Sequence, residues 1–197
     1  GELEGMIYQV GEYKDRDTYL RHCMKTVNDM ERIVKDILSA ARMGGSDFKL
    51  ERTDLDISRM LQKACRKVMG RIEDKEMELH QDIQPDFHYK GDARLLEKVF
   101  SNVLDNAVAY SPRGAVVTVT LQDGVLSVEN SGIHIEQEDL ERLFTPFYRV
   151  DKSRNRNSGG SGLGLYITKT ILDHHGISYS MENTENGVRF TALFRLL

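Results

Sequence analysis

The chain has 197 residues, of which 40% are hydrophobic and 29% charged, and its formal net charge is −4. This length suits one ordinary domain with an appendage, and the composition is that of a soluble globular protein. No run of residues approaches the roughly 20 apolar positions of a membrane span. The negative charge argues against nucleic-acid binding, because proteins of that class carry a clustered basic face.

The first ten residues have no helix N-cap, so we expect them to end a helix that begins before Gly1. After a connector, apolar residues recur at alternating steps of three and four. They are Leu20, Cys23, Val27, Met30, Val34, Ile37 and Ala41. This heptad spacing predicts one helix of an antiparallel hairpin that forms a four-helix bundle when two chains dimerise. The alternative is a helix that packs on its own domain.

Gly44, Gly45 and Ser46 end this helix and mark the expected domain boundary. The boundary divides the chain into residues 1–45, part of the dimerisation hairpin, and residues 46–197, a separate domain.

In the second part, segments with an apolar period of two alternate with segments of period 3.6. We expect strands at residues 48–55, 77–83, 116–121, 125–129, 178–182 and 188–194. Helices are expected at residues 58–72, 93–110, 137–144 and 163–175. Asp123 and Gly124 are typical of a tight hairpin turn. Hairpins mixed with helices predict an α+β fold, in which helices cover one face of a mixed sheet.

Cysteine and histidine positions favour structural roles. Cys23 and Cys65 both fall in apolar helical patterns, so we expect buried thiols in a reducing compartment rather than a disulfide or zinc ligands. His174 and His175 lie in the last turn of an expected helix, where interaction with the helix dipole accounts for them.

A glycine-rich loop precedes the last expected helix. Four of the six residues from Gly159 to Gly164 are glycine, and Leu163, Ile167 and Ile171 begin an amphipathic helix there. Unpaired backbone N–H groups at a helix start attract anions, as does the helix dipole, so the loop predicts a polyphosphate site. A flexible linker is the alternative, although a linker seldom opens directly into an amphipathic helix.

Two asparagines, Asn102 and Asn106, lie one turn apart on the same face of the expected helix at residues 93–110. Asparagine is a poor residue for a helix interior, so a pair at this spacing indicates a function. A carboxamide oxygen suits Mg²⁺, which keeps waters and substrate phosphates as its other ligands. Helix capping or simple solvation is the alternative.

Four segments, in order, resemble the motifs of sensor histidine kinases. Residues 102–112 (NVLDNAVAYSP) resemble the N box, and residues 128–132 (VENSG) the G1 box. Residues 143–149 (LFTPFYR) resemble the F box, and residues 160–165 (GSGLGL) the G2 box. The resemblance implies the Bergerat ATP-binding fold, a two-layer α/β sandwich, preceded by a remnant of the dimerisation hairpin.

The resemblance also implies roles for individual residues. Asn106 would ligate Mg²⁺, and Asn102 would assist the metal or the phosphates. Asn130 would meet the adenine amine, and Gly132 would let the base approach. The whole implied ATP site comprises Asn102, Asn106, Tyr110, Asn130, Gly132, Ile135, Phe144, Tyr148, Arg149, Lys152, Arg154, Gly160, Ser161, Gly162, Leu163, Gly164 and Leu165.

Residues 148–160 correspond to the mobile lid over ATP, and Gly162 would let a backbone amide approach the phosphates. The chain departs from the family pattern at three positions, where Asn130 replaces an aspartate, Ala109 a lysine and His134 a glycine. A neutral acceptor at residue 130 should weaken ATP binding by on the order of 1 kcal/mol relative to aspartate. Cations of the lid can replace the missing lysine, or they are simply solvated.

The family's phosphoacceptor histidine would precede Gly1, so we expect this segment to bind Mg-ATP without phosphorylating itself. The resemblance implies a homodimer in the intact protein, a response-regulator receiver domain as partner, and no nucleic acid. It further implies a cytoplasmic location, with membrane contact only through the N-terminal part. Residues 3–6, 10–15 and 132–135 are similar to the VanS-type kinases, which implies a role in glycopeptide-resistance signalling.

Two other functions remain open. Gyrase-like ATPases of the same fold carry a glutamate four residues before the Mg²⁺ asparagine, where this chain has Asn102, so hydrolysis should be slow. Ala109, Asn130 and His134 are compatible with a degenerate nucleotide-binding scaffold, whereas Asn106 and the complete G2 box argue against one.

Overall fold

The structure, a computed structural model, describes residues 7–8, 16–45, 48–150 and 161–195. Most of the expected first helix tail, residues 1–10, lies outside the described residues. In chain order the elements are α2 (Arg16–Met43), β1 (Thr53–Asp56), α3 (Ile57–Asp74), β2 (Glu78–Ile83), β3 (His88–Gly91), α4 (Ala93–Tyr110), β4 (Val116–Gln122), β5 (Val125–Ser131), α5 (Gln137–Leu140), α6 (Gly164–His175), β6 (Ser178–Asn183) and β7 (Gly187–Leu193). None of the described helices has the length and apolar character needed to cross a membrane.

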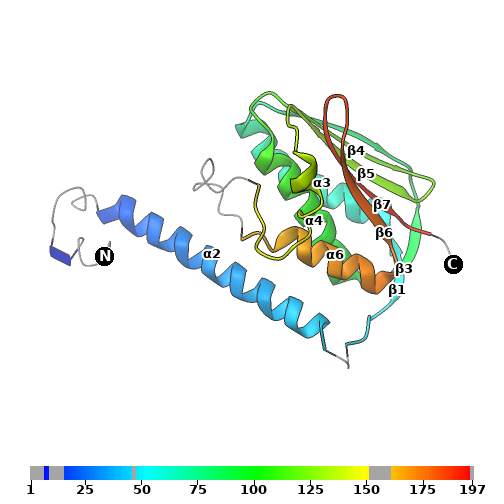
Figure 1. The fold of residues 1–197 in the computed structure, drawn as a ribbon, viewed down its shortest axis with the longest axis horizontal. Coiled ribbons are helices and arrows are strands. Elements are labelled where there is room, and N and C mark those ends of the chain that lie inside the picture. Colours follow the sequence, from blue (N-terminus) through cyan, green and yellow to red (C-terminus); the bar gives the residue numbers. More distant parts are fainter. Residues whose placement is uncertain (1–6, 9–15, 46–47, 151–160, 196–197) are drawn as a thin grey trace.

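Helices α3, α4 and α6 form one layer against a five-stranded sheet of order β2-β4-β5-β7-β6 (Figure 1). Strands β2 and β4 are parallel, and the other pairs in this sheet are antiparallel. Strands β1 and β3 pair separately as a two-stranded antiparallel sheet. The α+β sandwich and the mixed sheet predicted from the sequence are therefore confirmed.

Local signals set the ends of several elements. Asp123 and Gly124 both have positive φ, 49° and 78°, as a tight turn between β4 and β5 requires. The Asp92 carboxylate caps α4 by accepting hydrogen bonds from the backbone N–H groups of Arg94 and Leu95. Helix α6 ends at Gly176, whose φ of 70° is left-handed. The predicted turn at Asp123 and Gly124 and the predicted end of the last helix at Gly176 are thus confirmed.

Three elements differ from the sequence prediction. The first strand is limited to β1, because Phe48 packs its ring on His174, 4.8 Å away, instead of joining a ladder. Strand β3 was not predicted, since its four residues are too few to show a period of two. Helix α5 stops at Leu140, after which i→i+3 backbone bonds lead into Pro146, which disfavours helix before it.

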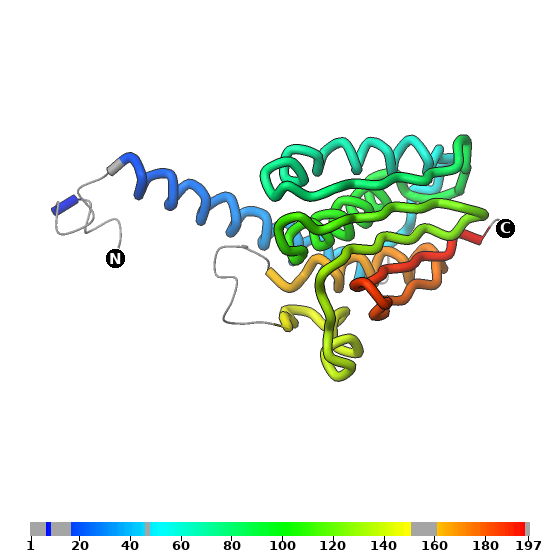
Figure 2. The backbone as a smooth tube through the Cα atoms, turned by 90° about the horizontal axis from the view of Figure 1, so that it is seen from above, coloured from blue at the N-terminus to red at the C-terminus, as the bar shows by residue number. Residues whose placement is uncertain are grey.

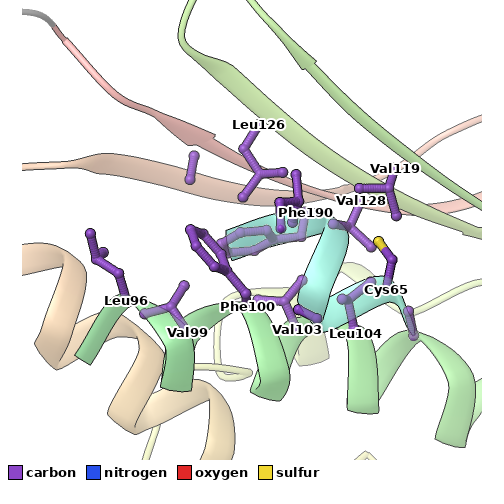
Figure 3. Packing of buried hydrophobic residues seen from close by; sticks show 14 of the residues in the cluster. Cys65, Leu96, Val99, Phe100, Val103, Leu104, Val119, Leu126, Val128 and Phe190 are labelled. Atoms are coloured by element: carbon purple, nitrogen blue, oxygen red, sulfur yellow. The ribbon is translucent and has the colours of Figure 1, made fainter. Parts of the chain in front are cut away.

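The core lies between α4 and the sheet (Figure 3). Phe100 and Val103 point from α4 toward Leu126 and Phe190 of the sheet. Cys65 joins this core from α3 with 0% of its surface exposed, and burial raises the pKa of its thiol to about 11. The expectation of a buried thiol is confirmed for this cysteine. It is wrong for Cys23, which is partly exposed on α2.

Helix α2 runs along the α6 side of the sandwich, and its N-terminal half projects beyond it (Figures 1 and 2). One face, with Ile33, Asp36, Ala40 and Met43, packs against the domain. The opposite face exposes an apolar stripe consisting of Leu20, Met24, Val27, Met30, Val34, Ile37 and Leu38. The helix therefore packs on its own domain through one face, and the bundle of two chains stays a prediction for the exposed face.

His175 has a larger role than the helix dipole alone would give it. Its ring is 4% exposed, its Nδ1 lies 2.7 Å from the carbonyl oxygen of Ile171, and its Nε2 accepts a hydrogen bond from the backbone N–H of Asp92. The ring therefore ties the end of α6 to the start of α4. The sequence-based interpretation, which gave this histidine only a dipole contact, is corrected.

Candidate functional site

A cavity of about 490 Å³ lies between α4, the end of β5, the segment that follows β5 and the start of α6. The following predicted site residues line it: Asn102, Asn106, Tyr110, Asn130, Ile135, Tyr148, Arg149, Ser161, Gly162, Gly164 and Leu165. Segments that are far apart in the sequence thus converge on one hollow. The motifs that were read separately form one site.

Three described residues of the predicted site stand outside the lining. Leu163 is buried in the core, and Phe144 packs on Tyr179 with 5.0 Å between the ring centroids. Gly132 has a φ of 79°, and a Cβ there would lie 2.9 Å from Cγ of Pro112. These residues support the walls from behind. The predicted Lys152, Arg154 and Gly160, and with them most of the expected lid, lie outside the described residues.

Asn102 ties α4 to the start of α6. Its Nδ2 donates to the carbonyl oxygen of Gly164 at 3.0 Å and to Oγ1 of Thr168 at 3.4 Å. Helix α6 begins without a side-chain cap, so its first backbone N–H groups have no intrahelical acceptor. Because Gly164 and Leu165 also line the cavity, this helix start offers N–H groups and a positive dipole end to an anion.

Asn106 lies one turn further along α4, half-buried at the cavity wall. Within the described part of the chain, no residue forms a hydrogen bond with its side chain, so its carboxamide oxygen is available to a ligand. One amide oxygen beside an anion site is a fitting partial ligand set for Mg²⁺, which takes its remaining ligands from phosphates and water. The donors present therefore fit this metal.

Asn130 lines the same cavity from β5, with 7% of its surface exposed. Its Nδ2 donates to Oγ of Ser111 at 2.9 Å. Ser111 directly follows α4 and donates its own proton to the carbonyl oxygen of Ala107 at 2.6 Å. Val128, Phe190 and Met181 are paired across the strands two positions from Asn130 and also line the cavity, so the amide has apolar neighbours that suit a flat ring with one polar edge.

The F-box segment is held to the start of α6. The backbone N–H of Phe147 donates to the carbonyl oxygen of Gly162 at 3.1 Å, and a Cβ on Gly162 would lie 2.8 Å from the carbonyl carbon of Phe147. Tyr148 donates its hydroxyl proton to Asp139, and this hydrogen bond raises the pKa of Tyr148. Arg142 stacks on the Tyr148 ring, 4.3 Å from its centroid.

Some lining residues were not predicted. Arg32 and Asp36 reach the cavity from α2, and no local sequence signal could reveal that contact, because it depends on how α2 docks. His134 also lines the cavity. Its φ is not positive, so the loop does not need a glycine at this position. Ser111 lies within the N-box segment, but its bond to Asn130 is visible only in the folded chain.

The comparisons with known proteins agree with this geometry. The sequence profile of the histidine kinase-, DNA gyrase B- and HSP90-like ATPases matches residues 91–197. The chain belongs to this family. Among its relatives is the sensor protein VanSB of Enterococcus faecalis, which is 36% identical over 95% of this chain and 43% of VanSB. Another relative is the sensor histidine kinase WalK of Bacillus subtilis, which is 31% identical over 84% of this chain and 29% of WalK. The chain spans less than half the length of these two relatives.

Solved structures of histidine kinases have the same fold. The nucleotide-free catalytic domain of ThkA is 27% identical, with a TM-score of 0.64 over 72% of this chain and 95% of that one. ThkA in complex with the response regulator protein TrrA is 23% identical, with a TM-score of 0.75 over 96% of this chain and 54% of that one. The second likeness concerns the fold alone and extends it to α2. A Bergerat-type ATP-binding domain accounts for the described sandwich.

Proposed function

We propose that this chain is the catalytic ATP-binding part of a two-component sensor histidine kinase. It binds Mg-ATP and donates the γ-phosphoryl group to a histidine of a dimerisation domain, for relay to an aspartate of a response regulator. The observation that carries the proposal is the convergence of Asn106, Asn130 and the open start of α6 on one cavity. In this proposal, Asn106 is the metal ligand, Asn130 is the amide that reads the base, and the start of α6 holds the phosphates.

Each part of the nucleotide has a place in this arrangement. The first N–H groups of α6 bind the phosphates, and Asn106 ligates Mg²⁺, which neutralises phosphate charge when bound. The Asn130 amide meets the amine of adenine between apolar side chains. Asn102 positions α4 against α6 through its bonds to Gly164 and Thr168. Lys152, Arg154 and Gly160 of the lid complete the phosphate contacts.

Phosphoryl transfer fits this site better than hydrolysis. Asn102 occupies the position, four residues before Asn106, where an ATPase of this fold needs a carboxylate to activate water. An amide cannot act as that base, whereas transfer to a positioned nucleophile depends mainly on orientation and electrostatics. The chain is therefore equipped to deliver phosphate to a partner group rather than to release it.

The open heptad face of α2 supports a homodimer in the intact protein, in which this stripe forms part of a helical bundle. A response-regulator receiver domain is the proposed acceptor of the phosphoryl group, as suggested by the complex of ThkA with TrrA. Similarity to VanSB supports a membrane-anchored sensor with this part in the cytoplasm, acting in glycopeptide-resistance signalling.

The deciding experiment combines this chain with a separately purified dimerisation domain that contains the phosphoacceptor histidine. With γ-³²P-ATP and Mg²⁺, acid-labile phosphate should appear on the added domain and not on this chain. Asn106→Ala should reduce that transfer at least 100-fold, whereas Asn186→Ala, an exposed turn residue outside the cavity lining, should leave it unchanged.

The alternatives predict other results. Nucleotide binding without any transfer would indicate a degenerate scaffold, and release of free phosphate in place of transfer would indicate an ATPase. Label on this chain itself would contradict the expectation that it phosphorylates only a partner.

A further inference from the structure

The hydrogen bonds around Ser111 determine which way the Asn130 amide faces. Oγ of Ser111 lies 2.6 Å from the carbonyl oxygen of Ala107, which can only accept. The single hydroxyl proton of Ser111 is therefore directed to that carbonyl. Its second neighbour, the Asn130 side chain at 2.9 Å, must supply a proton of its own, which only the amide nitrogen can do.

The oxygen of the Asn130 amide consequently points the other way. No described residue donates to Oδ1 of Asn130, and this atom is not among the fully buried polar atoms that lack a partner. Because Asn130 lines the cavity, its oxygen is open to the cavity. The site thus presents the amide oxygen, a hydrogen-bond acceptor, to a ligand. Without the contact to Ser111, the oxygen and the nitrogen of the amide would each fit at this position.

Ser111 is itself held in place. It is 4% exposed, and Nζ of Lys75 donates to its carbonyl oxygen at 2.9 Å. The same ammonium group donates to the carbonyl oxygens of Val108 and Ala109 at 2.8 and 3.0 Å, so it caps the end of α4. A hydroxyl anchored in this way cannot follow the amide if the amide turns over.

We propose that Ser111 is a specificity-determining residue of the nucleotide site, which fixes the Asn130 amide so that the site selects purines carrying a 6-amino group over purines carrying a 6-oxo group. The 6-amino group donates to Oδ1, whereas a 6-oxo group places two acceptors against each other. Without Ser111 the amide can turn over and present its N–H₂ to a 6-oxo base. The assignment rests on the proposed nucleotide site and concerns a residue that acts through Asn130.

The test compares ATP with inosine triphosphate, which has oxygen in place of the 6-amino group. Affinities are measured with Mg²⁺ by displacement of trinitrophenyl-ATP. In Ser111→Ala the ratio of ATP affinity to inosine triphosphate affinity should fall roughly tenfold, the effect of about one hydrogen bond. Ser127→Ala, on the same strand as Asn130 but outside the cavity lining, should keep the wild-type ratio.

The Asn130→Asp variant distinguishes an effect of Ser111 on the orientation of the amide from an effect of Ser111 on the structure around it. A carboxylate has an oxygen at both positions, so it offers an acceptor to the base whichever way it turns. In the Asn130→Asp background, Ser111→Ala should therefore leave the ATP preference unchanged. A residue that merely supports the end of α4 would weaken both nucleotides equally in both backgrounds, and that result would overturn the assignment.

Spectroscopy covers the case in which Ser111→Ala does not fold. In the wild-type chain with ATP bound, nuclear Overhauser contacts should join the Asn130 amide protons to the Ser111 β-protons. Contacts from those amide protons to the bound base instead would overturn the assignment. If the wild-type chain binds ATP and inosine triphosphate equally, the role of Ser111 is refuted and the proposed function is not. Failure to bind either nucleotide would refute the proposed function, and the assignment with it.

Discussion

Residue 130 shows how one atom can change the strength of a site without changing its shape. An asparagine and an aspartate fill nearly the same volume, and each places an oxygen where the base amine of the proposed ligand would lie. They differ in charge, and a hydrogen bond to an ionised acceptor is roughly twice as strong as one to a neutral acceptor. The difference in charge therefore affects ligand affinity, because no described residue donates a hydrogen bond to Oδ1 of Asn130 in the free protein.

Asn130→Asp should bind Mg-ATP several-fold more tightly than the present chain, a gain of about 1 kcal/mol. Calorimetric titration measures the difference, with Asn186→Asp as a control that adds the same charge to an exposed turn. Equal or weaker binding by Asn130→Asp would contradict this reasoning.

Individual residues also differ in whether their roles can be recognised from the sequence. Asn102 and Asn106 stood out because two asparagines one turn apart in a helix are unusual and match a motif, and Asn130 stood out because it replaces the aspartate of another motif. Ser111 did not, since the direction of its proton depends on Ala107 and on a strand that is remote in the chain. Hydrogen-bond direction is a property of the folded network, so motif reading cannot supply it.

At the scale of elements, the long periodic segments were predictable and the docking of α2 was not. Helix α4 has the predicted bounds, because its apolar stripe and its Asp92 cap both mark them. By contrast, α2 reads as one heptad helix from sequence, yet it carries a second contact face, in which Asp36 lies among apolar residues. The ion pair between Asp36 and Lys98, 2.9 Å apart, belongs to that face.

Lys98→Ala should loosen α2 from the domain. Asp36 is 5% exposed, so removal of its cation leaves a buried carboxylate without compensation, at a cost of about 1–3 kcal/mol. Helix α2 can relieve that cost by undocking, while the sandwich remains folded. Amide hydrogen exchange in the second half of α2 should therefore accelerate, with little change in the melting temperature of the domain.

Lys63→Ala is the matched control for this change. Its partner Glu97 is more exposed and retains a second lysine, Lys67, at 2.7 Å. Exposed pairs of this kind contribute little, so exchange in α2 should match the wild-type rate. The idea of an ion-pair contact would fail if Lys98→Ala left the exchange of α2 as slow as in the control.

For the whole molecule, one histidine links the folding free energy to pH. Burial lowers the pKa of His175 below its ordinary value of 6.5, because the charged ring would lose its hydration. The unfolded chain takes up a proton below about pH 6.5, and the folded chain resists it. Stability is therefore complete above pH 6.5 and falls as the pH drops toward the lowered pKa.

His175→Gln should flatten this dependence. The wild-type free energy of unfolding should decline between pH 7 and pH 5.5 by up to about 1.4 kcal/mol per pH unit from this group, and the variant should lose that part of the slope. A glutamine can still donate to Ile171 and accept from Asp92. Asn186→Gln, an exposed turn residue that does not titrate, should keep the wild-type slope in urea titrations at each pH. Parallel slopes in all three proteins would contradict the role of His175.

The presence of Arg32 and Asp36 in the cavity wall gives α2 a thermodynamic connection to whatever fills the cavity. If a nucleotide binds with different affinity when α2 is docked and when it is released, the ratio of those affinities equals the factor by which the nucleotide shifts the docking equilibrium. The helix that carries the open heptad stripe would then report on nucleotide occupancy. A partner that binds the stripe more tightly in one of these two states of α2 would in turn change the affinity of the site.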